Sequence, residues 1–138
     1  MIEKFNLCAQ ALPTLPVPHD AVIRRVFMEG EHLVFQFEEG IAVHDMVARI
    51  HPNARSLVIR YHLLEPEYDY YKSFNKAGKW GYLLKKPEKL LRLAVRGNKV
   101  TYLDHYVSYA SLIVVLFKGH TYRRVEMTAD EVEYEWLE

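Results

Sequence analysis

The stretch SLIVVLF, Ser111–Phe117, decides the fold. It shows no alternation of polar and apolar residues and is rich in β-branched side chains, which is typical of a strand covered on both faces. A basic segment precedes it, and strand-like segments lie on either side of it. Residues 85–127 therefore predict a short helix that leads into three strands, and we expect the rest of the chain to pack against Ser111–Phe117.

The composition is that of a soluble globular protein. Half of the 138 residues are hydrophobic and 26% are charged, so we expect residues 1–138 to form a single domain with one core. No apolar run approaches the roughly 20 residues that cross a bilayer, and the first residues lack the pattern of a signal peptide. The chain has one cysteine, Cys8. These features predict a cytoplasmic protein with no membrane partner.

Alternation predicts most of the strands. A hairpin over 21–28 and 32–38 turns at Gly30, although Arg24 and Arg25 stand side by side and break the pattern of its first strand. The other strands are expected at 57–64, 99–107, 111–118, 121–127 and 130–137. A capping box, Thr128 to Glu131, would favour a helix in the last of these, but seven residues of alternation favour the strand.

Three segments are less regular. Residues 2–12 predict a short helix, followed by an extended arm through residues 13–18, which include three prolines. We expect this arm to pack across its own sheet, with binding to a partner as the alternative. Residues 41–50 fit a helix about as well as a strand, and the tyrosine-rich residues 65–84 mix strand and turn signals.

A short basic helix is predicted at 87–96. Pro87 suits its first turn and Gly97 its C-terminal cap, although the apolar residues also fit a strand. Its basic side chains recur at helical spacing and share one face: Lys85, Lys89, Arg92 and Arg96. They belong to residues 72–99, which carry nine basic residues and one acidic residue and so a net charge of +8. The chain as a whole has a formal charge of zero.

Together these elements predict an α+β, mostly β fold. We expect an antiparallel sheet of about six to eight strands, curled or sandwich-like, with one or two short helices packed on it. The order of helix PEKLLRLAVRG, strands NKVTYLDHYVSYAS and LIVVLFKG, a basic strand and the ending VEYEW resembles a family of small, uncharacterised bacterial β-rich proteins. The resemblance covers about residues 19–38 and 87–136. It implies a fold, and no activity, cofactor or catalytic residue.

The sequence contains no catalytic motif. Its seven histidines lack the close spacing of a zinc site, so we predict no metal and no cofactor. Histidine and aspartate are adjacent three times, yet neighbours in a strand point to opposite faces, and the carboxylate then cannot orient its own imidazole. If the protein is an enzyme, the residues to test first are His105, Asp104 and His62, which we place at non-core strand positions. A solvated polar face is the favoured interpretation.

Three functions stay open. The first is a non-enzymatic interaction module that contacts an acidic protein partner or its own copy through Lys85, Lys89, Arg92 and Arg96 or through an exposed sheet edge. The second is a nucleic-acid-binding module, since Trp80 lies within the basic segment and could stack on bases. The third is a hydrolase or metal-dependent enzyme that uses histidine and aspartate on a sheet face.

Overall fold

The chain folds into one curled antiparallel sheet. The structure is a computed structural model that describes residues 1–43, 45–66, 70–74, 80–85, 99–118 and 121–138. Within these residues the elements are β1 (Ile2–Asn6), β2 (Ala21–Glu29), β3 (His32–Phe37), η1 (Ile41–Val43), α1 (Asp45–Ile50), β4 (Ser56–Leu63), β5 (Tyr70–Phe74), β6 (Trp80–Lys85), β7 (Val100–Ser108), β8 (Ser111–Lys118) and β9 (Thr121–Leu137). The predicted fold class, mostly β and antiparallel, is confirmed.

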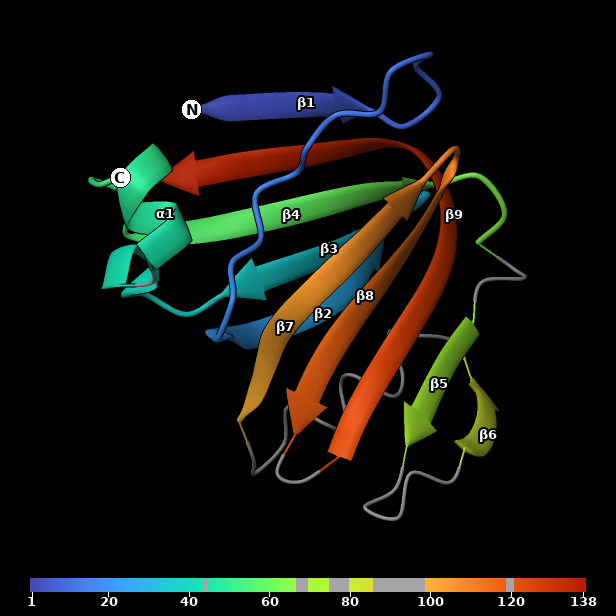
Figure 1. The fold of residues 1–138 in the computed structure, drawn as a ribbon. Helices are drawn as coiled ribbons and strands as arrows, with labels where there is room; N and C mark the ends of the chain where they lie inside the picture. Colours follow the sequence, from blue (N-terminus) through green and yellow to red (C-terminus); the bar gives the residue numbers. More distant parts are fainter. Residues whose placement is uncertain (44, 67–69, 75–79, 86–98, 119–120) are drawn as a thin grey trace.

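Strand β9 closes the sheet. The pairings run in the order β4–β3–β2–β7–β8–β9, and β9 pairs again with β4. This is possible because β9 is 17 residues long: its first half pairs with β8 and β5, and its second half with β4 and β1. Figure 1 shows β9 bending between these halves, so that the strands on its two sides face each other as two layers.

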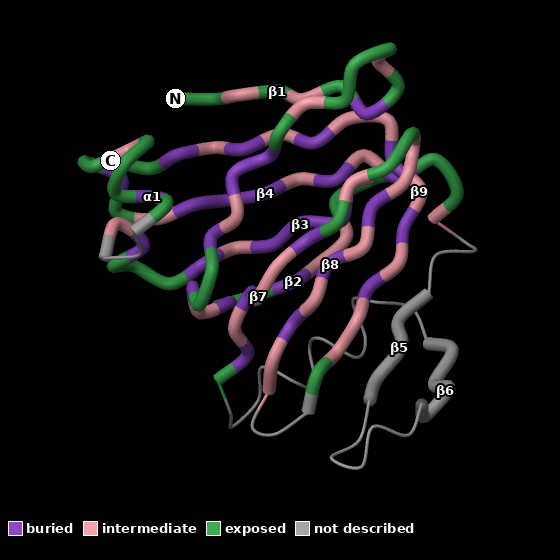
Figure 2. Tube along the Cα trace, viewed as in Figure 1, coloured by how far each residue is buried: buried purple, intermediate pink, exposed green. Residues whose placement is uncertain are grey.

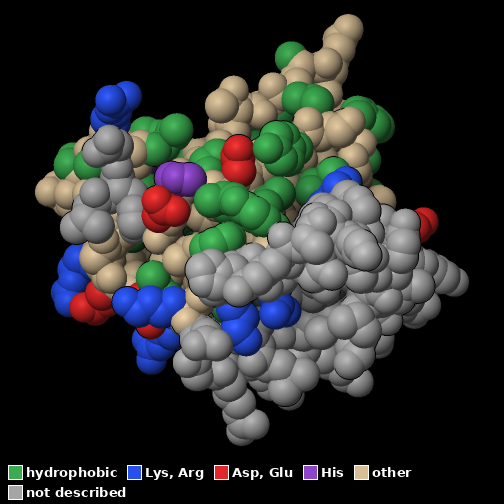
Figure 3. Space-filling view, turned by 60° about the horizontal axis from the view of Figure 1, so that its bottom comes forward, with side chains coloured by type: hydrophobic (Ala, Val, Ile, Leu, Met, Phe, Trp, Pro, Cys, Tyr) green, Lys and Arg blue, Asp and Glu red, His purple; other side chains and the backbone are tan. Residues whose placement is uncertain are grey.

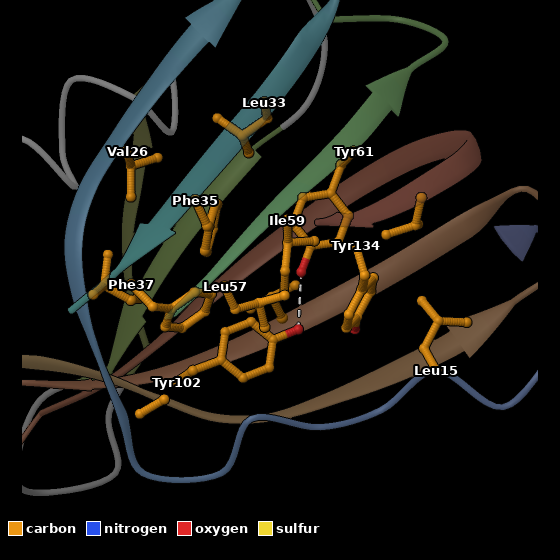
Figure 4. Packing of buried hydrophobic residues seen from close by; sticks show 14 of the residues in the cluster. Leu15, Val26, Leu33, Phe35, Phe37, Leu57, Ile59, Tyr61, Tyr102 and Tyr134 are labelled. Carbon is orange, nitrogen blue, oxygen red and sulfur yellow. Dashed lines mark hydrogen bonds between the residues drawn. The ribbon is translucent and has the colours of Figure 1, made fainter. Parts of the chain in front are cut away.

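The core lies between the two layers. Its largest fully buried side chains are aromatic and come from strands far apart in the sequence, among them Trp136, Tyr61, Tyr102, Tyr134 and Phe35. Phe35 meets Tyr61 edge to face, with ring centroids 5.4 Å apart. Figure 4 shows the rings of Phe35, Tyr61, Tyr102 and Tyr134 converging from β3, β4, β7 and β9. Burial of one such side chain contributes about 1.5–3 kcal/mol, so these rings stabilise the contact between the layers.

Strand β8 is buried on its inner face and half-buried on its outer face. Leu112, Val114 and Leu116 are at most 1% exposed, whereas Ile113 and Val115 are intermediate. Figure 2 shows the same alternation along the neighbouring strands. The expectation of complete cover on both faces is therefore met only on the inner face.

Bulges explain two pairs of adjacent polar residues that the alternation could not place. The register of β2 against β3 shifts between Ile23 and Arg25. Because the extra residue changes the phase of the strand, Ile23 and Val26 both face the core while Arg24 and Arg25 are both exposed. The Arg25 guanidinium lies 4.4 Å from the centroid of the Phe27 ring. A second bulge, in β7, bears on the site described below.

Four local predictions had different outcomes. The helix predicted over 2–12 is wrong: Ile2–Asn6 forms β1, which adds a ninth strand and pairs with β9. The segment 41–50, open between helix and strand, forms η1 and α1. The strands expected at 121–127 and 130–137 are the two halves of β9. The helix predicted at 87–96 lies outside the described residues.

The proline-rich arm crosses its own sheet, as predicted. It runs from the end of β1 to the start of β2 across the open side of the two layers (Figure 1). Leu15 is 3% exposed and belongs to the core cluster. The Tyr134 hydroxyl of β9 donates a hydrogen bond of 2.7 Å to the carbonyl of Pro16, and the imidazole of His105 in β7 lies 3.1 Å from the carbonyl of Leu15.

Candidate functional site

A buried chain of hydrogen bonds lies beneath the arm. The hydroxyls of Tyr61 and Tyr102 are 2.9 Å apart (Figure 4), and the Tyr102 hydroxyl lies 2.8 Å from Nδ1 of His105. Nε2 of His105 reaches the Leu15 carbonyl. We refer to Tyr61, Tyr102, His105 and Leu15 as the buried polar chain.

A bulge in β7 makes this chain possible. Residues three apart in a regular strand face opposite sides, so Tyr102 and His105 would not meet. The register against β8 shifts between Tyr102 and Asp104, and the additional residue turns both side chains inward. His105 is 9% exposed, so its predicted non-core position is wrong. Asp104 lies on the other side of the strand and accepts a hydrogen bond of 2.8 Å from the backbone N–H of His105.

The proton positions in the buried polar chain follow from the Leu15 carbonyl, which can only accept. Nε2 of His105 must therefore carry a hydrogen, and in the neutral ring Nδ1 accepts from the Tyr102 hydroxyl. Tyr102 in turn accepts from Tyr61. Burial lowers the pKa of His105 and outweighs its bond to Leu15, while burial raises the pKa of Tyr61, Tyr102 and Tyr134. The chain is thus neutral, and both ring nitrogens of His105 are engaged inside the protein.

A groove lies on the outer side of the arm. It has a volume of about 330 Å³ and is open to solvent, and it lies between the arm, α1, β7 and β8. Figure 3 shows hydrophobic side chains gathered on this face beside histidine and acidic side chains. We call it the arm groove, and define it by its lining residues: Val17, His19, Met46, Leu103, Asp104, Tyr106 and Val115.

The arm groove combines an apolar surface with negative charge. Five of its seven lining residues are apolar or aromatic, and two of these, Met46 and Tyr106, are 47% and 60% exposed. Asp104 contributes a carboxylate, and His19 is 3.3 Å from the Asp20 carboxylate at the base of the arm. His19 also bonds through Nδ1 to the Leu103 carbonyl at 2.7 Å, which holds the arm against β7.

His62 lies in a separate cluster on the outer face of β4. Its Nδ1 donates a hydrogen bond of 2.6 Å to Asp130, its Nε2 is 3.6 Å from Glu31, and its ring lies over His32 with centroids 4.9 Å apart. The bond to Asp130 raises the pKa of His62 and lowers the pKa of Asp130. An imidazole between two carboxylates keeps its proton to a higher pH than an isolated histidine, so this cluster is better suited to an ion pair than to a general base.

Asp130 reaches His62 because of a bulge at the bend of β9. His62 pairs with Glu131 and Leu63 with Ala129, which leaves Asp130 as the extra residue. The ion pair therefore ties β4 to the place where β9 passes from one layer to the other. The three residues predicted as first to test are not brought together, since His105 is buried, Asp104 faces the arm groove and His62 lies on the outside of β4.

No pattern in the sequence predicted the contacts at the N-terminus. One carboxylate oxygen of Glu3 accepts hydrogen bonds from Trp136 Nε1 at 2.7 Å and from His51 Nε2 at 2.6 Å. The His51 ring stacks on Trp136 with centroids 4.2 Å apart. The alternation of β1 places Glu3 and Phe5 toward these partners, and only the strand assignment of 2–6 would have revealed it.

The predicted partner-binding residues are mostly outside the described part of the chain. Trp80 begins β6 and Lys85 ends it, whereas Lys89, Arg92 and Arg96 lie in the range 86–98, which is not described. The acidic residues of β9 have a partner in β4: Arg60 is 2.8 Å from Glu135 and 4.0 Å from Glu133. The basic helix face therefore stays a prediction.

The described residues lack two features that mark particular kinds of function. None of the described helices is long and apolar enough to cross a membrane. Within the same residues, no group of three or more histidine, cysteine, aspartate or glutamate side chains is arranged to hold a metal ion. In comparisons with known proteins, no family model, no curated protein and no solved structure matches the chain.

Proposed function

We propose that the protein is a non-enzymatic interaction module that binds a protein segment in the arm groove. The observation that carries the proposal is an open, mostly apolar groove edged by the exposed side chains of Met46 and Tyr106. Small-molecule sites enclose most of their ligand, whereas tyrosine and methionine at an open surface are typical of protein interfaces. Methionine also adapts its shape to different partners.

The charge of the arm groove indicates the partner. Asp104 lies among the apolar lining residues, and Asp20 is close to His19 at the groove's edge. A large apolar side chain next to lysine or arginine would fill the groove and neutralise this charge. The acidic partner predicted from the sequence concerns residues 72–99 instead and stays a separate prediction, as do the cytoplasmic location and the resemblance to small bacterial β-rich proteins.

A phage-displayed library of random heptapeptides tests the proposal. We expect the protein to enrich peptides with an apolar residue beside a basic one, and a synthetic peptide of the consensus to bind the wild type at least tenfold more tightly than Tyr106→Ser or Asp104→Asn. Tyr109→Ser is the matched control, because Tyr109 is 65% exposed and does not line the groove. No enrichment, or equal binding to Tyr106→Ser, would contradict the proposal.

A second candidate function is binding of single-stranded nucleic acid on the outer face of the sheet. Phe117 and Tyr122 face each other across β8 and β9 with ring centroids 5.1 Å apart, and Tyr122 is 50% exposed. Arg124, which is 2.8 Å from Glu126, lies on the same face of β9 as Tyr122. Exposed aromatic rings beside basic residues can stack on bases. Titration with labelled oligothymidylate at low salt should then show binding that weakens steeply with salt and is reduced in Tyr122→Ala; no binding at low salt excludes this function.

A further inference from the structure

The arm forms one wall of the arm groove, so the groove depends on how the arm is held. Val17 and His19 line the groove. Just before them in the chain, Leu15 and Pro16 carry the carbonyls that attach the arm to the sheet. The buried side-chain attachments are the bond from His105 to Leu15 and the bond from Tyr134 to Pro16. At the base of the arm, His19 bonds to the Leu103 carbonyl and the Asp20 N–H to the Tyr102 carbonyl. Whatever lifts residues 12–20 from the sheet therefore removes part of the binding surface.

Of the two buried side-chain attachments, only the one at His105 changes its charge near neutral pH. The neutral ring accepts from Tyr102 at Nδ1 and donates to Leu15 at Nε2, as argued above. A second proton, on Nδ1, would face the hydrogen of the Tyr102 hydroxyl. That hydrogen would have to turn toward Tyr61, and the Tyr61 hydroxyl could then no longer donate to Tyr102. One proton thus disturbs every hydroxyl of the buried polar chain and leaves a cation in the core.

The surroundings of His105 offer little compensation for that cation. Among the described residues, His105 contacts the hydroxyl of Tyr102 in β7, which bonds in turn to Tyr61 of β4, while Tyr134 of β9 bonds to the next residue of the arm; all three tyrosines are buried and neutral. Asp104 is on the opposite side of β7, and its charge favours the protonated form less than burial opposes it. On the arm, the charged or titratable groups are the exposed pair His19 and Asp20 at its base. Water reaches His105 most directly if the arm moves away.

We propose that His105 is a proton-sensitive latch: when its imidazole takes up a second proton, residues 12–20 lift from the sheet and the arm groove loses one wall. The effect on binding rests on the proposed function, but the movement of the arm does not. The sign follows from linkage, since the lifted arm exposes a histidine of ordinary affinity for protons and the seated arm disfavours the charged form. Acid therefore favours the lifted arm, and the seated arm is favoured above the ordinary histidine range.

Hydrogen exchange of the arm tests the latch without any partner. Protection of the amides within residues 12–20, corrected for intrinsic rates, should fall about three- to tenfold in the wild type between about pH 7.5 and about pH 5.5. His105→Gln keeps a donor for Leu15 and an acceptor for Tyr102 but does not titrate, so its arm protection should not change. His32→Gln is the matched control, because it removes a titrating histidine from β3, where its ring contacts His62 and not the arm, and it should behave as the wild type. Equal protection at both pH values in the wild type, or a fall that persists in His105→Gln, overturns the latch.

A second variant and a second readout make each result decisive. Tyr134→Phe removes the bond to Pro16 without adding a titrating group, so the arm should be less protected at both pH values and lift at a higher pH. If His105→Gln fails to fold, the absence of such an upward shift in Tyr134→Phe overturns the latch instead. The consensus heptapeptide should bind the wild type more weakly in acid and bind His105→Gln equally at both pH values. Arm movement without a change in peptide binding would refute only the coupling between the arm and the groove. No peptide binding at all would refute the proposed function, and hydrogen exchange would still decide whether the latch exists.

Discussion

At the residue scale, the buried polar chain has a direction. The Leu15 carbonyl accepts from His105, His105 accepts from Tyr102, and Tyr102 accepts from Tyr61, so each hydroxyl has a distinct part. Tyr102 both donates and accepts, whereas Tyr61 only donates to it. A buried polar group without a partner costs more than the bond itself is worth, so the two tyrosines should respond differently to loss of their hydroxyls.

The direction predicts unequal effects of two conservative substitutions. Tyr102→Phe leaves Nδ1 of His105 without a donor and the Tyr61 hydroxyl without an acceptor, and should lower the free energy of unfolding by about 3 kcal/mol. Tyr61→Phe leaves the bond from Tyr102 to His105 intact and should cost about 1 kcal/mol. Urea unfolding of both variants at about pH 8, where histidine is neutral, measures the difference. Equal losses would contradict the assigned direction.

At the element scale, alternation located the strands but not their irregularities. The pattern of residues 57–64 has the right period and face, and β4 follows it closely. It could not show that Tyr102 and His105 share a face, or that β9 continues through its bend, because both depend on a single extra residue placed by tertiary packing. The arm groove was missed because its lining residues come from the arm and from three other elements, which only the tertiary structure brings together. Its only signal in the sequence was the proline-rich arm.

The ion pair at the bend of β9 predicts a pH-dependent contribution to stability. The pKa of His62 is raised above 6.5, so its contribution is complete below that value and is lost as the pH rises through the raised pKa. The pKa of Asp130 is lowered from 3.8, so its contribution is present above that value and is lost as the pH falls through the lowered pKa. His62→Gln should therefore be less stable than the wild type near pH 5 and approach it in alkali.

The size of this effect is limited by solvent. The side chains of His62 and Asp130 are 31% and 39% exposed, so we expect a difference of about 1 kcal/mol or less after screening. Urea titrations of both proteins from about pH 5 to about pH 9 measure it, and the contribution of His105 cancels because both proteins contain it. A difference that does not change with pH would show that His62 acts through packing.

At the scale of the whole molecule, β9 makes the two layers depend on each other. The strand supplies the buried side chain of Val125 to one layer and that of Val132 to the other, and both are fully buried. Because the strand order is closed through β9, each layer needs β9 to complete the pairing of its strands. The sequence predicts a single domain. In this arrangement, a loss of packing in one layer should destabilise the other layer by the same free energy.

Two cavity-forming substitutions test this dependence. Val125→Ala and Val132→Ala should each lower the free energy of unfolding by about 2 kcal/mol through lost burial and the cavity left behind. Because the layers unfold together, Val125→Ala should also speed exchange of the slowest amides in β3, a strand that does not pair with β9, by the same free energy as in β8. Val22→Ala, at a half-buried position of β2, is the control and should cost less than half as much. Faster exchange confined to β8 in Val125→Ala would mean that the layers unfold separately, and that closure by β9 does not couple them.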